Sequence, residues 1–130
     1  ILMAHDNVDM RETLRLLLSR VEKFQLVGEA SSGMEAIALA KQLSPDIILI
    51  DINMAPINGF EATRKIVKQN PDAKIIGLSV HKQPSYAKNI LSLGAKGYIT
   101  KSSSQKEIIL AINTVAEGKE YICKELGDVL

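Results

Sequence analysis

The chain has little cysteine, few aromatic residues and no long apolar run. Cys123 is the only cysteine among 130 residues, which excludes an intrachain disulfide and a zinc site built from several cysteines. No apolar run approaches the ~20 residues that a membrane-spanning helix needs. Because a lone thiol is typical of a reducing compartment, we expect a cytoplasmic protein. Because no apolar run is long enough to span a bilayer, we also expect no association with membranes.

An excess of charge of one sign is also lacking. The 16 basic and 15 acidic residues give a net charge of +1, and the two signs are interleaved along the chain. Domains that bind nucleic acid typically gather basic residues on one face, so we expect no DNA contact from these residues themselves. At 46% hydrophobic residues, the chain is long enough to bury the core of one domain.

What the chain does contain is a repeated alternation of short apolar runs and segments of helical period. Residues 47–50, all isoleucine or leucine, form the most hydrophobic run and indicate the centre of a sheet. Ser32 with Glu35 and Ser104 with Glu107 have the spacing of helix capping boxes. Five strand–helix units predict an α/β fold with a parallel sheet covered on both faces. The predicted strands are residues 1–4, 24–30, 47–50, 74–79 and 97–100.

Four of the predicted strands end in residues suited to phosphoryl chemistry. These are Asp6, Asp51, Ser79 and Lys101. In a parallel sheet, ligands bind beyond the carboxyl ends of the strands, where these side chains would meet. Taken singly, each residue is commonly a turn, cap or surface residue, but two carboxylates, a hydroxyl and an ammonium at one edge suit a divalent cation and a phosphoryl group. The pattern therefore predicts phosphoryl transfer to Asp51.

The segments 1–7, 46–61, 75–79 and 97–101 resemble the receiver domain of two-component response regulators. The stretch from Gly97 to Ser102 is most similar to the LuxR/NarL/FixJ-type subfamily, which carries a C-terminal helix-turn-helix domain. The resemblance implies a flavodoxin-like (βα)5 doubly wound sheet of strand order 2-1-3-4-5. It also implies a receiver domain over residues 1–118 and, over residues 119–130, the start of a linker to a DNA-binding output domain that this chain lacks.

The resemblance further implies a role for each residue at the strand ends. Asp51 would accept a phosphoryl group from a sensor histidine kinase or a small phosphodonor, a self-modification that we do not class as enzyme activity. Mg²⁺, or another divalent cation, would bind Asp6, Asp51 and the backbone carbonyl of Asn53. Lys101 would then pair with a phosphoryl oxygen.

Two further residues would carry the switch. Ser79 would donate a hydrogen bond to the phosphoryl group, and Tyr98 would be the aromatic side chain that moves inward when Ser79 shifts. The domain would then signal within a regulator of transcription.

The sequence departs from the family pattern at His5, at Ser102 and in the loop after Asp51, where Pro56 stands one place later than usual and we expect only a local change of turn. His5 stands where the family usually has a second acidic residue, which acts on the metal through water. Imidazole suits transition metals better than Mg²⁺, so His5 is either an outer-shell group near the metal or a structural residue. The family's proline after the lysine is Ser102 here, which leaves the isomer of the Lys101–Ser102 bond open.

Two alternative functions stay open. A degenerate receiver would bind partners without being phosphorylated, and the departure at His5 is its only support. A flavin carrier or small hydrolase of the same fold would need a phosphate-binding glycine loop, a nucleophile elbow or flavin-stacking aromatic residues. The chain has neither motif, and its aromatic content is 4%.

Apolar residues outside the predicted helix stripes suggest self-association. Leu16 and Leu110 lie off the core faces of the first and last predicted helices, which we expect side by side on one face of the sheet. We therefore expect a homodimer that phosphorylation strengthens, although isolated exposed leucines need no partner.

Overall fold

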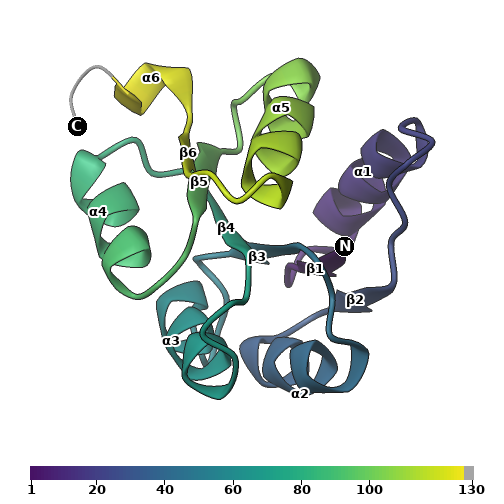
Figure 1. Ribbon diagram of the computed structural model, residues 1–130, viewed down its shortest axis with the longest axis vertical. Helices are drawn as coiled ribbons and strands as arrows, with labels where there is room; N and C mark the ends of the chain where they lie inside the picture. The colour runs from purple at the N-terminus through teal and green to yellow at the C-terminus, as the bar shows by residue number, and fades with distance from the viewer. Residues whose placement is uncertain (128–130) are drawn as a thin grey trace.

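The computed structural model describes residues 1–127 of the chain. Six parallel strands form one sheet of order β2-β1-β3-β4-β5-β6, which confirms the predicted order and adds a sixth strand beside β5. Figure 1 shows α1 and α5 on one side of this sheet and α2, α3 and α4 on the other. The strands are β1 (Leu2–Ala4), β2 (Gly28–Ala30), β3 (Ile48–Asp51), β4 (Ile75–Ser79), β5 (Gly97–Thr100) and β6 (Tyr121–Ile122).

The helices begin where short polar side chains can cap them. Ser32 and Ser104 each accept a hydrogen bond from the backbone N–H three residues later, as the capping pattern predicts. Asn7 and Asn58 cap α1 and α3 in the same way. The helices are α1 (Val8–Ser19), α2 (Gly33–Leu43), α3 (Gly59–Gln69), α4 (Pro84–Ser92), α5 (Gln105–Ala116) and the short α6 (Lys124–Gly127).

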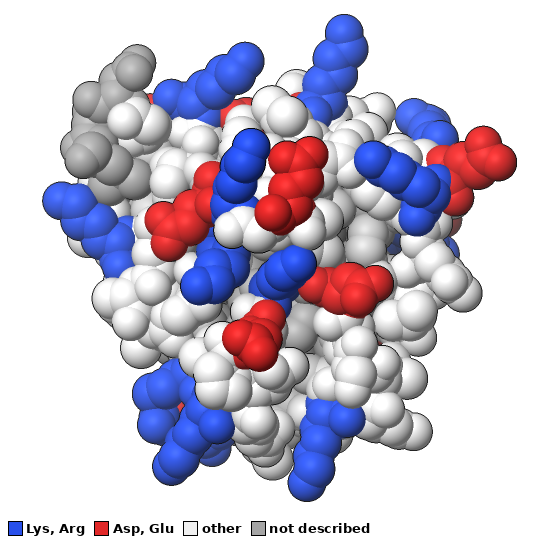
Figure 2. All heavy atoms as spheres, in the orientation of Figure 1, with Lys and Arg blue, Asp and Glu red and all other residues white. Residues whose placement is uncertain are grey.

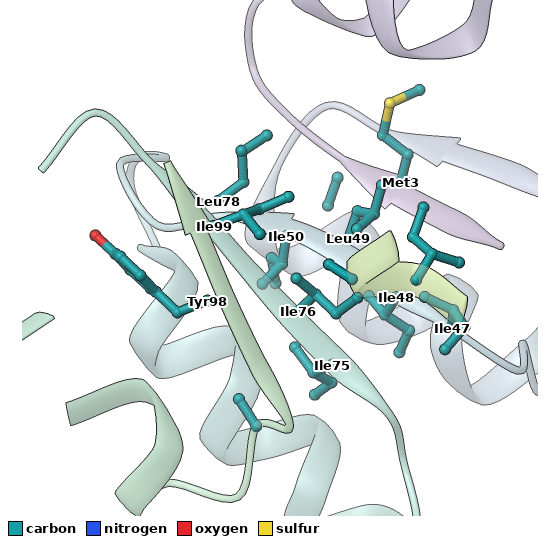
Figure 3. Close-up of a cluster of buried hydrophobic side chains, with 14 of the residues drawn as sticks. Met3, Ile47, Ile48, Leu49, Ile50, Ile75, Ile76, Leu78, Tyr98 and Ile99 are labelled. Atoms are coloured by element: carbon teal, nitrogen blue, oxygen red, sulfur yellow. The ribbon is translucent and has the colours of Figure 1, made fainter. Parts of the chain in front are cut away.

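The core lies on both faces of the central strands. Every residue of β3 and β4 is buried, as a sheet covered by helices on both faces requires. Figure 3 shows the side chains of β3, β4 and β5 filling the space on either side, with Tyr98 pointing away from Ile99 across β5. This packing fixes the strand ends, and with them every polar residue at the carboxyl edge.

The C-terminal segment is more ordered than the sequence predicts. Residues 119–130 were expected to begin a linker, but Tyr121–Ile122 pair with β5, and Cys123 and Leu126 are buried. The Tyr121 hydroxyl donates to Glu107 Oε2 at 2.8 Å, and the Lys124 backbone N–H donates to the same oxygen at 2.7 Å. The predicted boundary at residue 118 therefore lies just past the end of α5 at Ala116, while packed structure continues to Gly127; residues 128–130 lie outside the described part.

The surface agrees with the composition. Figure 2 shows basic and acidic side chains interspersed over the face drawn there. Among residues 1–127, no helix has the length and apolar character needed to cross a membrane.

Candidate functional site

The strand register brings the predicted site residues to one edge of the sheet. Asp51, the last residue of β3, lies opposite Leu78, so Ser79 extends one step further on β4. Ser79 in turn lies opposite Thr100, so Lys101 follows directly after β5. His5 and Asp6 follow the end of β1, whose last residue pairs with Ile50. The five side chains therefore come from four different strand ends around Asp51.

Asp51 lies at the centre of this group and is almost fully buried, with 1% of its side chain exposed. Its Oδ1 accepts a hydrogen bond from the Asn53 backbone N–H at 3.2 Å and lies 3.4 Å from Lys101 Nζ. Its Oδ2 faces the other way, 3.6 Å from His5 Nδ1. A buried carboxylate needs such partners, because desolvation without them is costly. The two oxygens thus face two chemically different halves of the site.

The half formed by β4 and β5 contains a hydroxyl and an ammonium. Lys101 is partly exposed, at 21%, and therefore reaches the crevice from solvent. Ser79 is fully buried, and its Oγ donates to Asn53 Oδ1 at 3.0 Å and accepts from the His81 backbone N–H at 3.1 Å. Asn53 therefore connects Asp51 with Ser79 through its backbone and its side chain. From the sequence we predicted a role for the Asn53 carbonyl only and missed this amide, which no local pattern marks.

Tyr98 lies behind Ser79, on β5. Its ring is fully buried, and its hydroxyl donates to the His81 carbonyl at 2.5 Å. Burial of the ring raises the pKa of the Tyr98 phenol. The His81 ring stacks on Tyr86, with ring centroids 4.2 Å apart. Tyr98 thus already occupies the inward position that the family resemblance associates with switching.

The half formed by β1 contains His5 and Asp6. The His5 ring is 2% exposed, whereas the Asp6 side chain is 45% exposed. His5 Nδ1 lies 3.6 Å from Asp6 Oδ1, the same distance that separates it from Asp51 Oδ2. Burial lowers the pKa of His5, and the nearby Asp51 carboxylate opposes this effect. Arg11, which no sequence pattern marked, holds the segment by donating to the His5 carbonyl at 2.6 Å.

His5, Asp6 and Asp51 can together hold a divalent cation. One ligand atom from each of these residues lies within 4.8 Å of the other two. Carboxylate oxygens are suitable ligands for Mg²⁺ and for transition metals, so the donor set fits a divalent cation. The imidazole is the member of this set that Mg²⁺ does not favour.

The peptide bond after Lys101 is trans. Within the described residues, the one cis peptide bond joins Ala55 to Pro56, in the loop between β3 and α3. The Gly59 backbone N–H donates to the Ile52 carbonyl at 2.8 Å and closes that loop. The loop therefore ends where α3 begins, at Gly59.

Comparison with known proteins agrees with this geometry. Residues 1–113 match the family described as the response regulator receiver domain. The chain is 37% identical over 122 residues, 94% of its length, to the transcriptional regulatory protein DegU of Brevibacillus brevis. It is 34% identical over its full 130 residues to the response regulator GacA of Pseudomonas viridiflava. The chain spans 52% of the length of DegU and 61% of the length of GacA.

Solved structures give the same result. A LuxR-family two-component response regulator from Aurantimonas sp. SI85-9A1 superimposes with a TM-score of 0.95 at 30% identity, covering 98% of this chain and 91% of that chain. The receiver domain of the putative response regulator NarL from Mycobacterium tuberculosis gives a TM-score of 0.86 at 28% identity, covering 91% and 95%. The predicted similarity to LuxR/NarL-type regulators is thus confirmed. This chain belongs to the response regulator receiver domain family.

Proposed function

We propose that this domain is a signalling switch that accepts a phosphoryl group on Asp51 from a sensor histidine kinase or a small phosphodonor. The observation that supports this most strongly is the buried Asp51 carboxylate, with Lys101 Nζ 3.4 Å from one oxygen and a possible cation site beside the other. The reaction modifies the domain itself, so it is a switching step rather than turnover of a separate substrate. The kinase and the switch would operate in the cytoplasm.

In the proposed step, an Asp51 carboxylate oxygen forms a bond to phosphorus as the bond from phosphorus to the donor breaks. With a phosphohistidine donor, the imidazole nitrogen keeps the electron pair of the broken bond, and Asp51 becomes an acyl phosphate. Asp6, Asp51 and the Asn53 carbonyl would hold a divalent cation, whose positive charge would reduce the repulsion between the approaching anions. Lys101 supplies a second positive charge on the opposite side of the carboxylate.

The signal would then pass through Ser79 and Tyr98. A phosphoryl group adds nearly two negative charges and strong acceptor oxygens. Ser79, which now donates to Asn53, would donate to a phosphoryl oxygen instead. Because the His81 backbone contacts both Ser79 and Tyr98, a shift of Ser79 would reach the Tyr98 hydroxyl and the loop before α4.

The output of the switch belongs to the proposal as well. Exposed Leu16 on α1 and Leu110 on α5 lie on the same side of the sheet, where Arg20 Nη1 donates to Gln105 Oε1 at 3.4 Å. They supply a surface for a homodimer that tightens on phosphorylation. Sedimentation of both forms tests this part: Leu110→Glu should prevent the tighter association, and an unchanged monomer after confirmed phosphorylation would end it. DNA contact would come from an output domain beyond these residues.

Intact-mass measurement tests the acceptor. After incubation with acetyl phosphate and a divalent cation, the mass should rise by one phosphoryl group, and Asp51→Asn should abolish the rise. Asp46→Asn, an exposed aspartate before the opposite end of β3, is the matched control and should leave the rise intact. Phosphorylation that persists in Asp51→Asn would refute the assignment, and no modification of the wild-type protein would favour the degenerate receiver.

A further inference from the structure

We propose that His5 binds the divalent cation directly through Nδ1, and that it makes the site prefer a first-row transition-metal ion to Mg²⁺. This inference rests on the cation site in the proposed function and assigns a ligand and a metal class to it. The sequence alone left His5 as an outer-shell or structural residue. Three features of the structure favour direct coordination.

The first feature is the lone pair on His5 Nδ1. The Asn7 backbone N–H donates a hydrogen bond to this nitrogen at 3.1 Å, so Nδ1 is the unprotonated nitrogen of the ring. It therefore cannot donate a hydrogen bond to either carboxylate. An unprotonated nitrogen and two carboxylate oxygens thus lie close together without a proton between them. Their lone pairs and negative charges repel one another, and a shared cation would remove this repulsion.

The second feature is the spacing of the three ligand atoms. Around an ion with metal–ligand bonds of about 2.0–2.1 Å, neighbouring ligands are about 3.4 Å apart in tetrahedral geometry and about 2.9 Å apart in octahedral geometry. His5 Nδ1 lies 3.6 Å from Asp6 Oδ1 and 3.6 Å from Asp51 Oδ2. The three ligand atoms all lie within 4.8 Å of one another, so an inward movement of the half-exposed Asp6 side chain would complete the set.

The third feature is that hydrogen bonds fix the backbone of His5 but leave its ring able to exchange one contact for a metal ion. The His5 backbone N–H donates to the Ala30 carbonyl at 3.0 Å, and its carbonyl accepts from Arg11. Within residues 1–127, the buried His5 Nε2 has no hydrogen-bond partner, so the ring is not positioned by bonds from both nitrogens. A bound metal would replace the Asn7 contact, and because Asn7 is exposed, its amide could then bond to water.

The chemistry of the three ligand atoms decides which metal ion the site binds best. Mg²⁺ prefers oxygen ligands and keeps several of its waters, whereas imidazole binds Co²⁺, Ni²⁺ and Zn²⁺ well. Replacing a carboxylate by a neutral imidazole also removes one negative charge, which weakens the binding of a hard cation most. The substitution at His5 therefore moves selectivity away from Mg²⁺.

Titration with Co²⁺ tests the inference, because its visible absorption reports ligand type and geometry. His81 is the only other histidine, so His81→Gln is a matched control in which a histidine signal can come only from His5. Wild type and His81→Gln should bind Co²⁺ alike. His5→Asp should bind Co²⁺ at least about tenfold more weakly and Mg²⁺ more tightly. Equal Co²⁺ affinity in wild type and His5→Asp would overturn the inference.

A second measurement does not require any change at His5. In ¹⁵N-labelled His81→Gln, saturating Zn²⁺ should shift the Nδ1 resonance of the remaining imidazole, and an unshifted resonance would overturn direct coordination. Both measurements omit a phosphodonor. The intact-mass measurement with acetyl phosphate reports the proposed function separately. Weaker Co²⁺ binding in His5→Asp, together with no gain of a phosphoryl group by the wild-type protein in that measurement, would refute the proposed function alone. Equal Co²⁺ affinity, together with a phosphorylated Asp51, would refute this inference alone.

Discussion

The two halves of the site around Asp51 differ in how far they follow the family pattern. On the side of β4 and β5, Ser79 and Lys101 provide the hydroxyl and the ammonium that the pattern requires. On the side of β1, an imidazole replaces one carboxylate next to Asp6. We call His5 and Asp6 the cation-binding half, after the proposal, and Ser79 and Lys101 the phosphate-binding half. Because the halves face different oxygens of Asp51 and come from different strands, we expect the cation-binding half to change without moving the phosphate-binding half. We therefore expect the proposed acceptor role and the proposed metal preference to be separable.

Lys101→Ala should lower stability more than a substitution in the cation-binding half. Removing the ammonium leaves the Asp51 carboxylate buried without its cationic partner, and we expect the free energy of unfolding to fall by about 1–3 kcal/mol. From the sequence we expect a solvated lysine charge to contribute little to stability, but the pairing with a buried carboxylate changes that expectation. Urea denaturation measures the effect.

The control for Lys101→Ala is Lys119→Ala. Lys119 pairs with Glu117 at 3.7 Å, but both side chains are well exposed, so its removal should cost less than about 1 kcal/mol. Equal destabilisation by the two substitutions would mean that the ion pair with Asp51 contributes no more to stability than an exposed ion pair. Loss of phosphorylation-dependent spectral change in Lys101→Ala would independently support its role in the switch.

The site could be predicted from the sequence where the signal lies in a single strand. Residues 47–50 form a continuous apolar run, so the sheet centre and the position of Asp51 at its end follow from local pattern alone. The same holds for Ser79 and Lys101, which lie at the ends of apolar strands. Strand order additionally required the family resemblance.

The remaining features depend on contacts between distant segments. The two-residue strand β6 has no pattern of its own; it forms because the Tyr121 backbone N–H donates to the Lys96 carbonyl and the Cys123 backbone N–H to the Tyr98 carbonyl. Glu107, predicted as part of a capping box, accepts from Tyr121 and Lys124 instead of completing that box. The orientation of the His5 ring likewise depends on Asn7, and no spacing rule reveals it.

Asp6→Asn should weaken the cation-binding half without disturbing the fold. Removing a half-exposed carboxylate takes one charged ligand from the site, so we expect divalent-cation affinity to fall by about tenfold, with unfolding free energy changed by less than about 0.5 kcal/mol. Calorimetric titration measures the affinity. Asp9→Asn, an exposed aspartate in the first turn of α1, should leave it unchanged, and equal losses in both variants would indicate a general charge effect.

The smallest expected effect concerns the attachment of α6 to the loop after β5. Glu125 accepts from the Thr100 and Ser102 hydroxyls and lies 3.6 Å from Lys82 Nζ. The hydrogen bond from Thr100 is the main reason that the pKa of Glu125 lies below its usual value, and the ammonium of Lys82 contributes less. Because the folded-state pKa is depressed, this stabilisation is present above the unfolded pKa and is lost as pH falls through the folded value.

Acidification should therefore shift the backbone amide resonances of Cys123 and Leu126 as Glu125 is protonated. Glu125→Gln should remove that pH-dependent step, while Glu117→Gln should preserve it. An identical acid transition in wild type and Glu125→Gln would show that another group controls the position of α6.

The switch itself is tested most directly by following backbone amide resonances while acetyl phosphate and a divalent cation modify Asp51. We expect the resonances of Ser79, Tyr98 and Lys101 to shift in wild type in proportion to the phosphorylated mass fraction, and none of them to shift in Asp51→Asn. Wild-type protein that gains the mass of a phosphoryl group while these three resonances stay in place would contradict a switch that runs from Asp51 through Ser79 to Tyr98.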